Sequence, residues 1–362
     1  MEKGLCEICN PKQWKTISSD MLTENGYPVY GANGVIGYYT SYNHEEPTIL
    51  ITCRGATCGT LNICEPFSYV NGNAMALDNL SKEIDIRYLY YYLSSRGLSD
   101  VITGSAQPQI VRQSLVKVKV MYPPLDEQRK IAAVLDKVSD LISKRRQQLD
   151  KLDLLIKSRF VEMFGDPVSN PYQWEKVSLS DLADVRIGPF GSLLHKEDYI
   201  VGGYPLVNPS HILDDKIMVD EKLSVSKQKY AELEPYHLKI GDVVMGRRGE
   251  MGRCAVVQCD GLLCGTGSLL IRTKSDVTAD YIQKIISFPS FKKTIEDMAV
   301  GQTMPNLNVP IVSNFQIIKP PLPIQEHYYS FVEQTEKTKT TISRSLEKLE
   351  TLKKALMQEY FG

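Results

Sequence analysis

The feature that most constrains this 362-residue chain is an internal duplication. Asn-Pro-Lys-Gln-Trp at residues 10–14 is followed 160 residues later by Asn-Pro-Tyr-Gln-Trp at residues 170–174. Pro-Pro-Leu at 123–125 has its counterpart at 320–322, and that offset of 197 continues to the last residue. The difference between the offsets, 197 minus 160, assigns 37 extra residues to the second copy. We therefore expect two similar structural units that match at their ends and differ in the segments between.

The composition excludes few functions by itself. Hydrophobic residues make up 43% of the chain and charged residues 23%, as in ordinary globular proteins. No apolar run reaches the length of about 20 residues that a membrane span needs, and the first residues contain no signal peptide. We therefore expect a cytoplasmic protein. The net charge of −1 argues against a generally basic surface but leaves room for a local basic groove.

The eight cysteines raise the question of a metal site. Cys6 and Cys9 form the one Cys-x-x-Cys pair, and neither a second pair nor a His pair stands at zinc-ligand spacing. Reduced thiols in strands or cores are the favoured interpretation, and a metal site is the alternative. We expect no metal ligand set in this chain.

Each copy ends in a long segment that is typical of an amphipathic helix. Residues 126–165 and 323–362 follow a proline pair, contain no internal glycine, and end on Gly165 and Gly362. Apolar residues recur at steps of three, four and seven, which favours two antiparallel helices packed as a coiled coil. A stripe buried in a globular core is the alternative. The packing and docking candidates are Leu135, Ile142, Leu149, Leu152, Ile156, Leu346, Leu349 and Leu356.

The remaining segments have short β-branched or aromatic runs separated by glycine-rich turns. They predict two mixed α/β domains in a pseudo-two-fold arrangement, so the fold class is α+β. The predicted division is a first domain at 1–122, a helical spacer at 123–165, a second domain at 166–319 and a second spacer at 320–362.

A search for catalytic motifs finds no phosphate-binding loop, no His-Glu-x-x-His and no nucleophile elbow. The five histidines are scattered. The two Asn-Pro pairs lack the second proline and the aromatic residue of an amino-methyltransferase tetrapeptide, so turn or helix-entry roles explain them better. We therefore expect no catalytic residue in this chain.

Paired polar motifs favour recognition instead. Arg54 opens Arg-Gly-Ala-Thr-Cys-Gly after an apolar run, and Arg248 opens a similar turn in the second copy. A guanidinium suits phosphates and guanine edges, although a structural ion pair is the alternative for each arginine. Gly-Ser-Ala-Gln-Pro-Gln-Ile at 104–110 corresponds to 301–307, and its amides could contact adenine or cap a turn. The DNA-contact candidates are Arg54, Thr57, Gln107, Gln109, Arg247, Arg248, Arg253 and Asn306.

The ordered set of motifs resembles the specificity subunit of a type I DNA restriction-modification system. The resemblance covers nearly the whole chain and rests on the Asn-Pro-x-Gln-Trp starts, the Arg-Gly turns and Gly-Ser-Ala-Gln-Pro-Gln-Ile. Pro-Pro-Leu-Asp-Glu-Gln-Arg-Lys-Ile at the start of the first long helix, and Phe-Gly at the end of each helix, complete it. One departure is the first domain, which is shorter than the second, at 122 against 154 residues.

This resemblance implies two target recognition domains, each reading one half of a bipartite, gapped double-stranded DNA site. The helices would set the gap and dock two methyltransferase subunits, which bring S-adenosylmethionine and flip an adenine. Restriction-translocase subunits would use ATP and magnesium, so none of these cofactors is expected in this chain. The location implied is the nucleoid of a prokaryotic cytoplasm.

Three alternatives remain at this point. The chain could be a coiled-coil adaptor that binds proteins or glycans, a solitary modification enzyme, or an orphan specificity subunit. The DNA sequence, the gap length and the oligomeric state are not determined by these motifs, because base readout depends on loop geometry and DNA shape.

Overall fold

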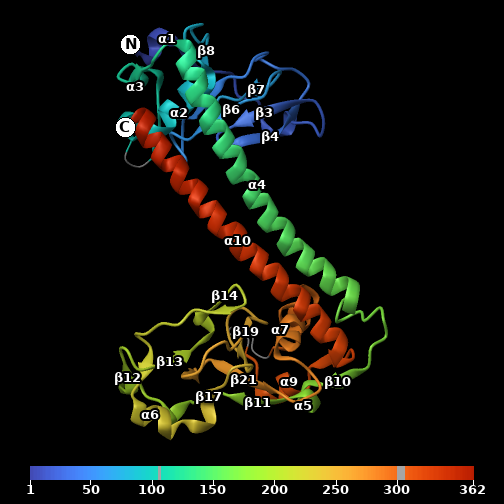
Figure 1. Cartoon of the computed structure of the whole chain (residues 1–362). Coiled ribbons are helices and arrows are strands. Elements are labelled where there is room, and N and C mark those ends of the chain that lie inside the picture. The colour runs from blue at the N-terminus through green and yellow to red at the C-terminus, as the bar shows by residue number, and fades with distance from the viewer. Residues whose placement is uncertain (105–106, 300–305) are drawn as a thin grey trace. The chain divides into compact units, whose positions relative to one another are not determined.

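The computed structural model describes the whole chain apart from residues 105–106 and 300–305, and the chain divides into two units (Figure 1). Unit 1 comprises Met1–Leu149 with Thr341–Gly362, and unit 2 comprises Asp150–Thr340. Each unit contains short strands, short helices and part of both long helices. The predicted α+β class is confirmed.

Unit 1 is built on a four-stranded antiparallel sheet in the order β2-β8-β5-β6. A three-stranded sheet, β4-β3-β7, and a two-stranded ribbon, β1-β9, lie in the same unit. Its elements are β1 (Glu2–Gly4), α1 (Leu5–Ile8), β2 (Asn10–Gln13), β3 (Tyr27–Gly31), β4 (Gly34–Tyr39), β5 (Ile49–Thr52), β6 (Leu61–Ile63), β7 (Tyr69–Val70), β8 (Ala74–Asp78), α2 (Ile86–Arg96), α3 (Arg112–Leu115) and β9 (Lys119–Met121).

Unit 2 repeats the four-stranded sheet in the order β11-β21-β18-β19 and the ribbon as β10-β22. Its other sheet is larger, β12-β16-β13-β20-β17, and a hairpin, β14-β15, has been added. Its elements are β10 (Lys176–Ser178), α5 (Leu179–Leu182), β11 (Ala183–Ile187), β12 (Tyr199–Ile200), β13 (Tyr204–Val207), β14 (Ile212–Leu213), β15 (Lys216–Ile217), β16 (Ser224–Val225), α6 (Lys227–Glu232), β17 (His237–Leu238), β18 (Val243–Gly246), β19 (Cys254–Val256), β20 (Leu262–Cys264), β21 (Ser268–Thr273), α7 (Ala279–Ser287), α8 (Pro289–Met298), α9 (Val309–Ser313) and β22 (Gln316–Ile318).

The continuous apolar run of β5 has a structural reason. Successive side chains of a strand point to opposite faces, and in β5 both faces are covered. Ile49 and Ile51 belong to the core that includes Leu89 of α2, whereas Leu50 belongs to a second core. The equivalent strand of unit 2, β18, divides its side chains between two cores in the same way.

The two copies are not related in the register that the Asn-Pro-x-Gln-Trp motifs predict. Lys3 of β1 pairs with Val120, and Val177 of β10 pairs with Ile317, so the first strands are related by an offset of 174. Residues 10–13 form β2, whereas residues 170–174 form a turn ahead of β10. The equivalence of these two motifs, predicted from sequence, is therefore wrong.

The new register also redistributes the extra residues of the second copy. The offset is 174 at β1 and β10, 177 at β3 and β13, 194 at β5 and β18, and 197 at β9 and β22. Between these ends the second copy gains 197 minus 174, or 23 residues, of which 17 lie between β13 and β18. The other 14 of the predicted 37 come from the mistaken equivalence of the Asn-Pro-x-Gln-Trp motifs, since 174 minus 160 is 14.

The two long helices are confirmed as α4 (Leu125–Phe164) and α10 (Leu322–Phe361). Within unit 1 they run antiparallel, since Arg146 of α4 pairs with Glu350 of α10 at 2.6 Å and the earlier Ile142 shares a cavity lining with the later Met357. Within unit 2 they also run antiparallel, as Lys339 contacts Asp153 at 2.6 Å and the Tyr328 hydroxyl donates to the Ile156 carbonyl at 3.2 Å. No helix in the described part of the chain is long and apolar enough to cross a membrane.

The predicted packing residues of these helices all lose solvent exposure to some degree. Leu135, Ile142 and Ile156 are buried. Partial burial is found for Leu149, Leu152, Leu346, Leu349 and Leu356. Their role in subunit docking, and the functional division at 122, 165 and 319, remain predictions.

A buried glutamine fixes the start of each long helix to its unit. Gln128 accepts a hydrogen bond from the Asp85 backbone at 2.9 Å and donates to the Pro123 carbonyl at 2.9 Å. Gln325 makes the same two contacts, with Thr278 at 3.2 Å and Pro320 at 2.9 Å. Because buried polar groups need partners, this glutamine joins the proline pair, the long helix and the start of α2 or α7. The Pro-Pro-Leu-x-x-Gln motif thus has a structural role in both copies.

Candidate nucleic-acid interface

The two polar motifs predicted from sequence meet in each unit. In unit 1, Arg54 forms an isolated antiparallel bridge with Gln109, and the Ile110 amide donates to the Cys53 carbonyl at 2.9 Å. In unit 2, Arg248 forms the same kind of bridge with Asn306. The Leu307 amide there donates to the Arg247 carbonyl at 3.0 Å. A guanidinium and a carboxamide are therefore placed on neighbouring backbone positions at equivalent sites of both units.

Local structure explains why the motifs take this form. Gly55 and Gly249, which follow the bridging arginines, have φ values of +87° and +81°. Side chains with a Cβ rarely adopt this left-handed region, so glycine allows the chain to turn directly after the strand. The residue after the bridging amide is fully buried in each unit, as Ile110 in unit 1 and Leu307 in unit 2, and holds the bridge against the core. Residues 105–106 of the first amide motif and residues 301–305 of the second lie outside the described residues.

The arginines of the candidate interface differ in whether their guanidinium groups already have partners within the protein. Within the described part of the chain, the exposed side chains of Arg54 and Arg248 form no hydrogen bond or ion pair. Arg253, in contrast, pairs with Glu250 at 2.6 Å and donates to the Pro209 carbonyl at 3.3 Å. Arg54 and Arg248 are therefore the better candidates for a phosphate or a guanine.

Arg247 lies under the turn and is partly desolvated. Burial and the neighbouring Arg248 lower the pKa of its guanidinium from the ordinary value. Its Nε and the Oδ1 atom of Asn306 are buried, and neither has a hydrogen-bond partner among the described residues. An unpaired buried polar atom lowers the stability of the fold. The Arg247 Nε–H group is therefore suited to donate a hydrogen bond to a bound ligand, and the Asn306 Oδ1 atom to accept one.

The other unit 1 candidates lie around the same turn. Gln107 and Gln109 are exposed, and Pro108 between them accepts a hydrogen bond from the Gly55 amide at 3.2 Å. The Thr57 hydroxyl donates to Asn33 of the β3–β4 turn at 2.7 Å. Thr57 therefore holds two loops of unit 1 together, and contact with DNA by any of these side chains remains a prediction.

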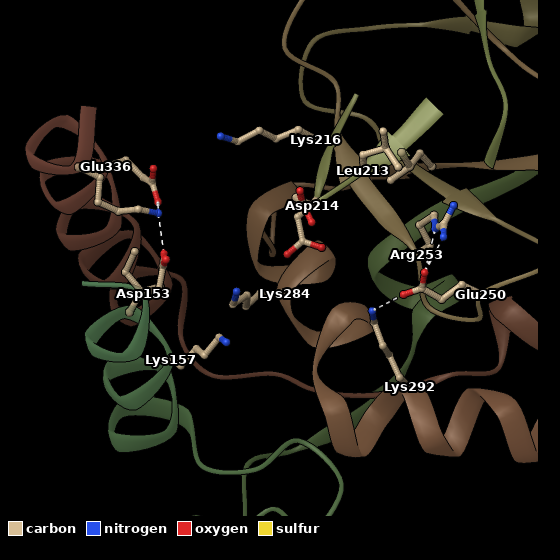
Figure 2. A pocket seen from close by; sticks show the side chains of 14 residues that line it. Asp153, Lys157, Leu213, Asp214, Lys216, Glu250, Arg253, Lys284, Lys292 and Glu336 are labelled. Atoms are coloured by element: carbon tan, nitrogen blue, oxygen red, sulfur yellow. Dashed lines mark hydrogen bonds and ion pairs between the residues drawn. The ribbon is translucent and has the colours of Figure 1, made fainter. Parts of the chain in front are cut away.

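A charged cavity of about 770 Å³ in unit 2 is a second concave feature (Figure 2). Figure 2 shows Lys157 of α4, Lys284 of α7 and Lys216 of β15 directed toward its open space. Acidic side chains share the lining, and three of them, Glu250, Asp153 and Glu336, already pair with cations. This alternation of charges is unlike a phosphate-binding groove, which would be uniformly positive. We do not assign it to DNA recognition.

The cysteines lie mostly inside the fold. Burial raises the pKa of the Cys9 and Cys264 thiols to about 12 and that of Cys53 to about 11. Such thiols remain protonated at neutral pH and act as small apolar side chains. Among the described residues, no group of His, Cys, Asp or Glu is arranged to hold a metal ion.

Comparison with known proteins now decides the family. A family model described as the type I restriction modification DNA specificity domain matches residues 1–152 and 171–351. The chain belongs to this family. Its function class is DNA-recognition specificity, and the resemblance inferred from the motifs is confirmed.

Individual members of the family resemble the chain over most of its length. It is 22% identical over 359 residues to a putative type I restriction enzyme specificity subunit of Haemophilus influenzae, covering 95% of this chain and 89% of that protein. It is 26% identical over 315 residues to a type I restriction enzyme specificity subunit of Methanocaldococcus jannaschii, covering 79% and 70%.

Solved structures share the fold of this specificity subunit. The S subunit of a type I restriction-modification system from M. genitalium matches with a TM-score of 0.66 at 14% identity, covering 100% of this chain and 96% of that one. A chain solved for complex assembly and conformational transition of the type I R-M system matches with a TM-score of 0.58 at 16% identity, covering 100% and 97%.

One exposed loop beside the arginine turn of unit 2 was not singled out from the sequence. Residues 188–193, Gly-Pro-Phe-Gly-Ser-Leu, leave β11 at the same end of the sheet from which the Arg248 turn leaves β18. The signal available was an aromatic residue inside a Gly-Pro-x-Gly turn, which an apolar core does not require.

Proposed function

We propose that this specificity subunit reads a bipartite, gapped site in double-stranded DNA, with unit 1 contacting one half and unit 2 the other. The observation that supports this is the repeated bridge, Arg54 with Gln109 and Arg248 with Asn306. Arginine can contact guanine or phosphate in a bidentate manner, and glutamine or asparagine can contact adenine in the same way. Two such pairs, each on a different set of loops, suit two different half-sites.

The long helices would set the gap and dock two methyltransferase subunits. Exposed apolar residues on α4 support a docking role, because they recur at steps of seven as Val134 and Leu141 and as Leu154 and Val161. S-adenosylmethionine, ATP and magnesium would be bound by the modification and restriction subunits. This chain would then direct catalysis without catalysing, in a prokaryotic cytoplasm.

The proposal is tested with the full chain assembled with its modification subunits. We expect the logarithm of the affinity for duplex DNA to fall linearly with the logarithm of the salt concentration, because phosphate contacts release counterions. Mapping of methylated adenines, with and without the gene, should reveal a gapped, asymmetric motif that disappears with the gene. Salt-independent binding and no lost motif would instead favour a protein-binding adaptor.

A further inference from the structure

The loop of residues 188–193 exposes two large apolar side chains. Phe190 is 57% exposed and Leu193 is 41% exposed. Neither belongs to the hydrophobic clusters that the described residues form. Two neighbouring apolar side chains on one short loop form a small surface that folding does not require.

The base of this loop lies next to the arginine turn. The Gly188 amide donates to the Ser268 carbonyl at 3.0 Å, and the Arg247 amide donates to the Gly267 carbonyl at 3.1 Å. Strands β11 and β18 therefore end on either side of the same residues of β21. Neighbouring strands lie about 4.8 Å apart, so the two loops start about 10 Å from one another. Phe190 and Arg248 leave the sheet at the same end.

The backbone of the loop is specified by glycine. A Cβ at Gly188 would lie 1.9 Å from the Gly265 carbonyl oxygen, so no other residue fits without a shift of the backbone. Gly191 has a φ of +62°, and the ring of Pro189 restricts φ at its own position. Phe190 thus follows one conformationally restricted position, Pro189, which reduces the entropy lost when Phe190 makes a contact.

Unit 1 uses the equivalent loop differently. In the register of the paired strands, Trp14 follows β2 where Gly188 follows β11. The Trp14 indole donates to Asp78 at 3.1 Å and meets the His44 ring edge-on at 5.2 Å between centroids. This aromatic side chain is fixed against its own unit, and the residue that corresponds to Phe190 in this register is Thr16, since 190 minus 174 is 16. The exposed aromatic side chain of this loop is therefore a feature of unit 2.

We propose that Phe190, supported by Leu193, is a specificity-determining residue that contacts bases in the half-site read by unit 2. This rests on the proposed function. Apolar side chains read DNA through the methyl group of thymine or by inserting between base pairs, and both contacts depend on sequence. Arg248 provides positive charge at the same end of the sheet, which would bring the loop to the duplex. In unit 1 the corresponding loop has Thr16 in place of Phe190, so that loop would not make this contact.

The test compares Phe190→Ala with Ile240→Ala in the complete modification complex. Ile240 is 60% exposed and precedes β18, at the opposite end of the same sheet, so it is a matched loss of exposed apolar surface. Affinity is measured for a duplex that carries the mapped methylation motif, for duplexes with each base pair of both half-sites changed in turn, and for unrelated DNA. Thermal unfolding of both variants checks that the fold is intact.

We expect Phe190→Ala to lower affinity for the specific site about tenfold, which is the size of one base-pair discrimination. Affinity for unrelated DNA and the salt slope should not change, and discrimination should be lost at one or two adjacent base pairs of one half-site. Phe190→Leu should keep part of the specific affinity that Phe190→Ala loses. Ile240→Ala should leave both the specific affinity and the discrimination unchanged. An unchanged specific affinity, or an equal loss for specific and unrelated DNA, would overturn the inference. If the complex without any substitution shows no preferred DNA site, the proposed function itself is contradicted, whatever Phe190 does.

Discussion

Units 1 and 2 share a skeleton and differ in what extends from it. The four-stranded sheet, the two-stranded ribbon, the arginine bridge and the buried glutamine joint occur in both. Unit 2 has a five-stranded second sheet where unit 1 has three strands, and it adds a hairpin. Most of its 23 extra residues therefore enlarge the second sheet and leave the joint to the helix unchanged. The two units therefore share the contacts that attach them to the long helices and differ in their second sheets.

The largest effect should come from exchanging one predicted recognition domain while keeping the long helices and the other domain. Replacing residues 166–319 with the corresponding segment of another specificity subunit should change one half of the methylated motif completely and leave the other half as it was. The reason is that the bridge in each unit is formed by residues of that unit alone. Sequencing of methylated adenines measures the result. A change in both halves would show that the units do not read independently.

The buried glutamines test whether the joint is equally important in the two units. Gln128→Ala removes contacts with Asp85, Pro123 and also the Glu83 carbonyl, whereas Gln325→Ala removes the two contacts with Thr278 and Pro320. Each substitution should lower the free energy of unfolding, by about 3 kcal/mol for Gln128 and about 2 kcal/mol for Gln325, because buried groups lose their partners.

Urea unfolding of the full chain measures these losses. The exposed neighbours provide matched controls, since Glu127→Ala and Glu326→Ala remove side chains of similar size one position away. Losses no greater than those of the controls would contradict a structural role for the motif.

The bridging arginines test whether the two interfaces bind DNA in the same way. Arg54→Ala and Arg248→Ala should each reduce the slope of log affinity against log salt by about one, if each side chain contacts one phosphate. Arg253→Ala should have a smaller effect, because Glu250 already neutralises that guanidinium. Binding isotherms at several salt concentrations measure the slopes. An equal effect at all three positions would mean that the ion pair with Glu250 opens when DNA binds.

The sequence predicted the elements that depend on periodicity and failed where short motifs had to be aligned. Apolar spacing and proline pairs predicted α4 and α10 to within one residue, because a long helix is determined by local pattern. The Asn-Pro-x-Gln-Trp match was misleading, since the same residue types form a strand at 10–13 and a turn at 170–174. In the turn, Asn170 and Gln173 have positive φ, and the Asn170 side chain binds the Trp174 backbone, which composition does not reveal.

For the candidate site, the sequence identified the bridging residues but not their pairing. Arg54 and Gln109 are separated by more than fifty positions, and only the strand register brings them together. The Phe190 loop was missed because its significance lies in the sheet end that it shares with Arg248, which is a long-range property.

The smallest effect should come from the ion pairs between the long helices, which also differ between the units. Arg146 and Glu350 in unit 1 have side chains that are 63% and 45% exposed, so Arg146→Ala should cost less than about 0.5 kcal/mol. Lys339 in unit 2 is 21% exposed and contacts both Asp153 and Glu336, so Lys339→Ala should cost about 1 kcal/mol. Urea unfolding in low salt measures both losses. In 1 M salt, where the screening length falls to about 3 Å, the loss at Arg146 should vanish while part of the loss at Lys339 persists. Equal losses that vanish together would show that the helix pair is held by apolar packing to the same degree in both units.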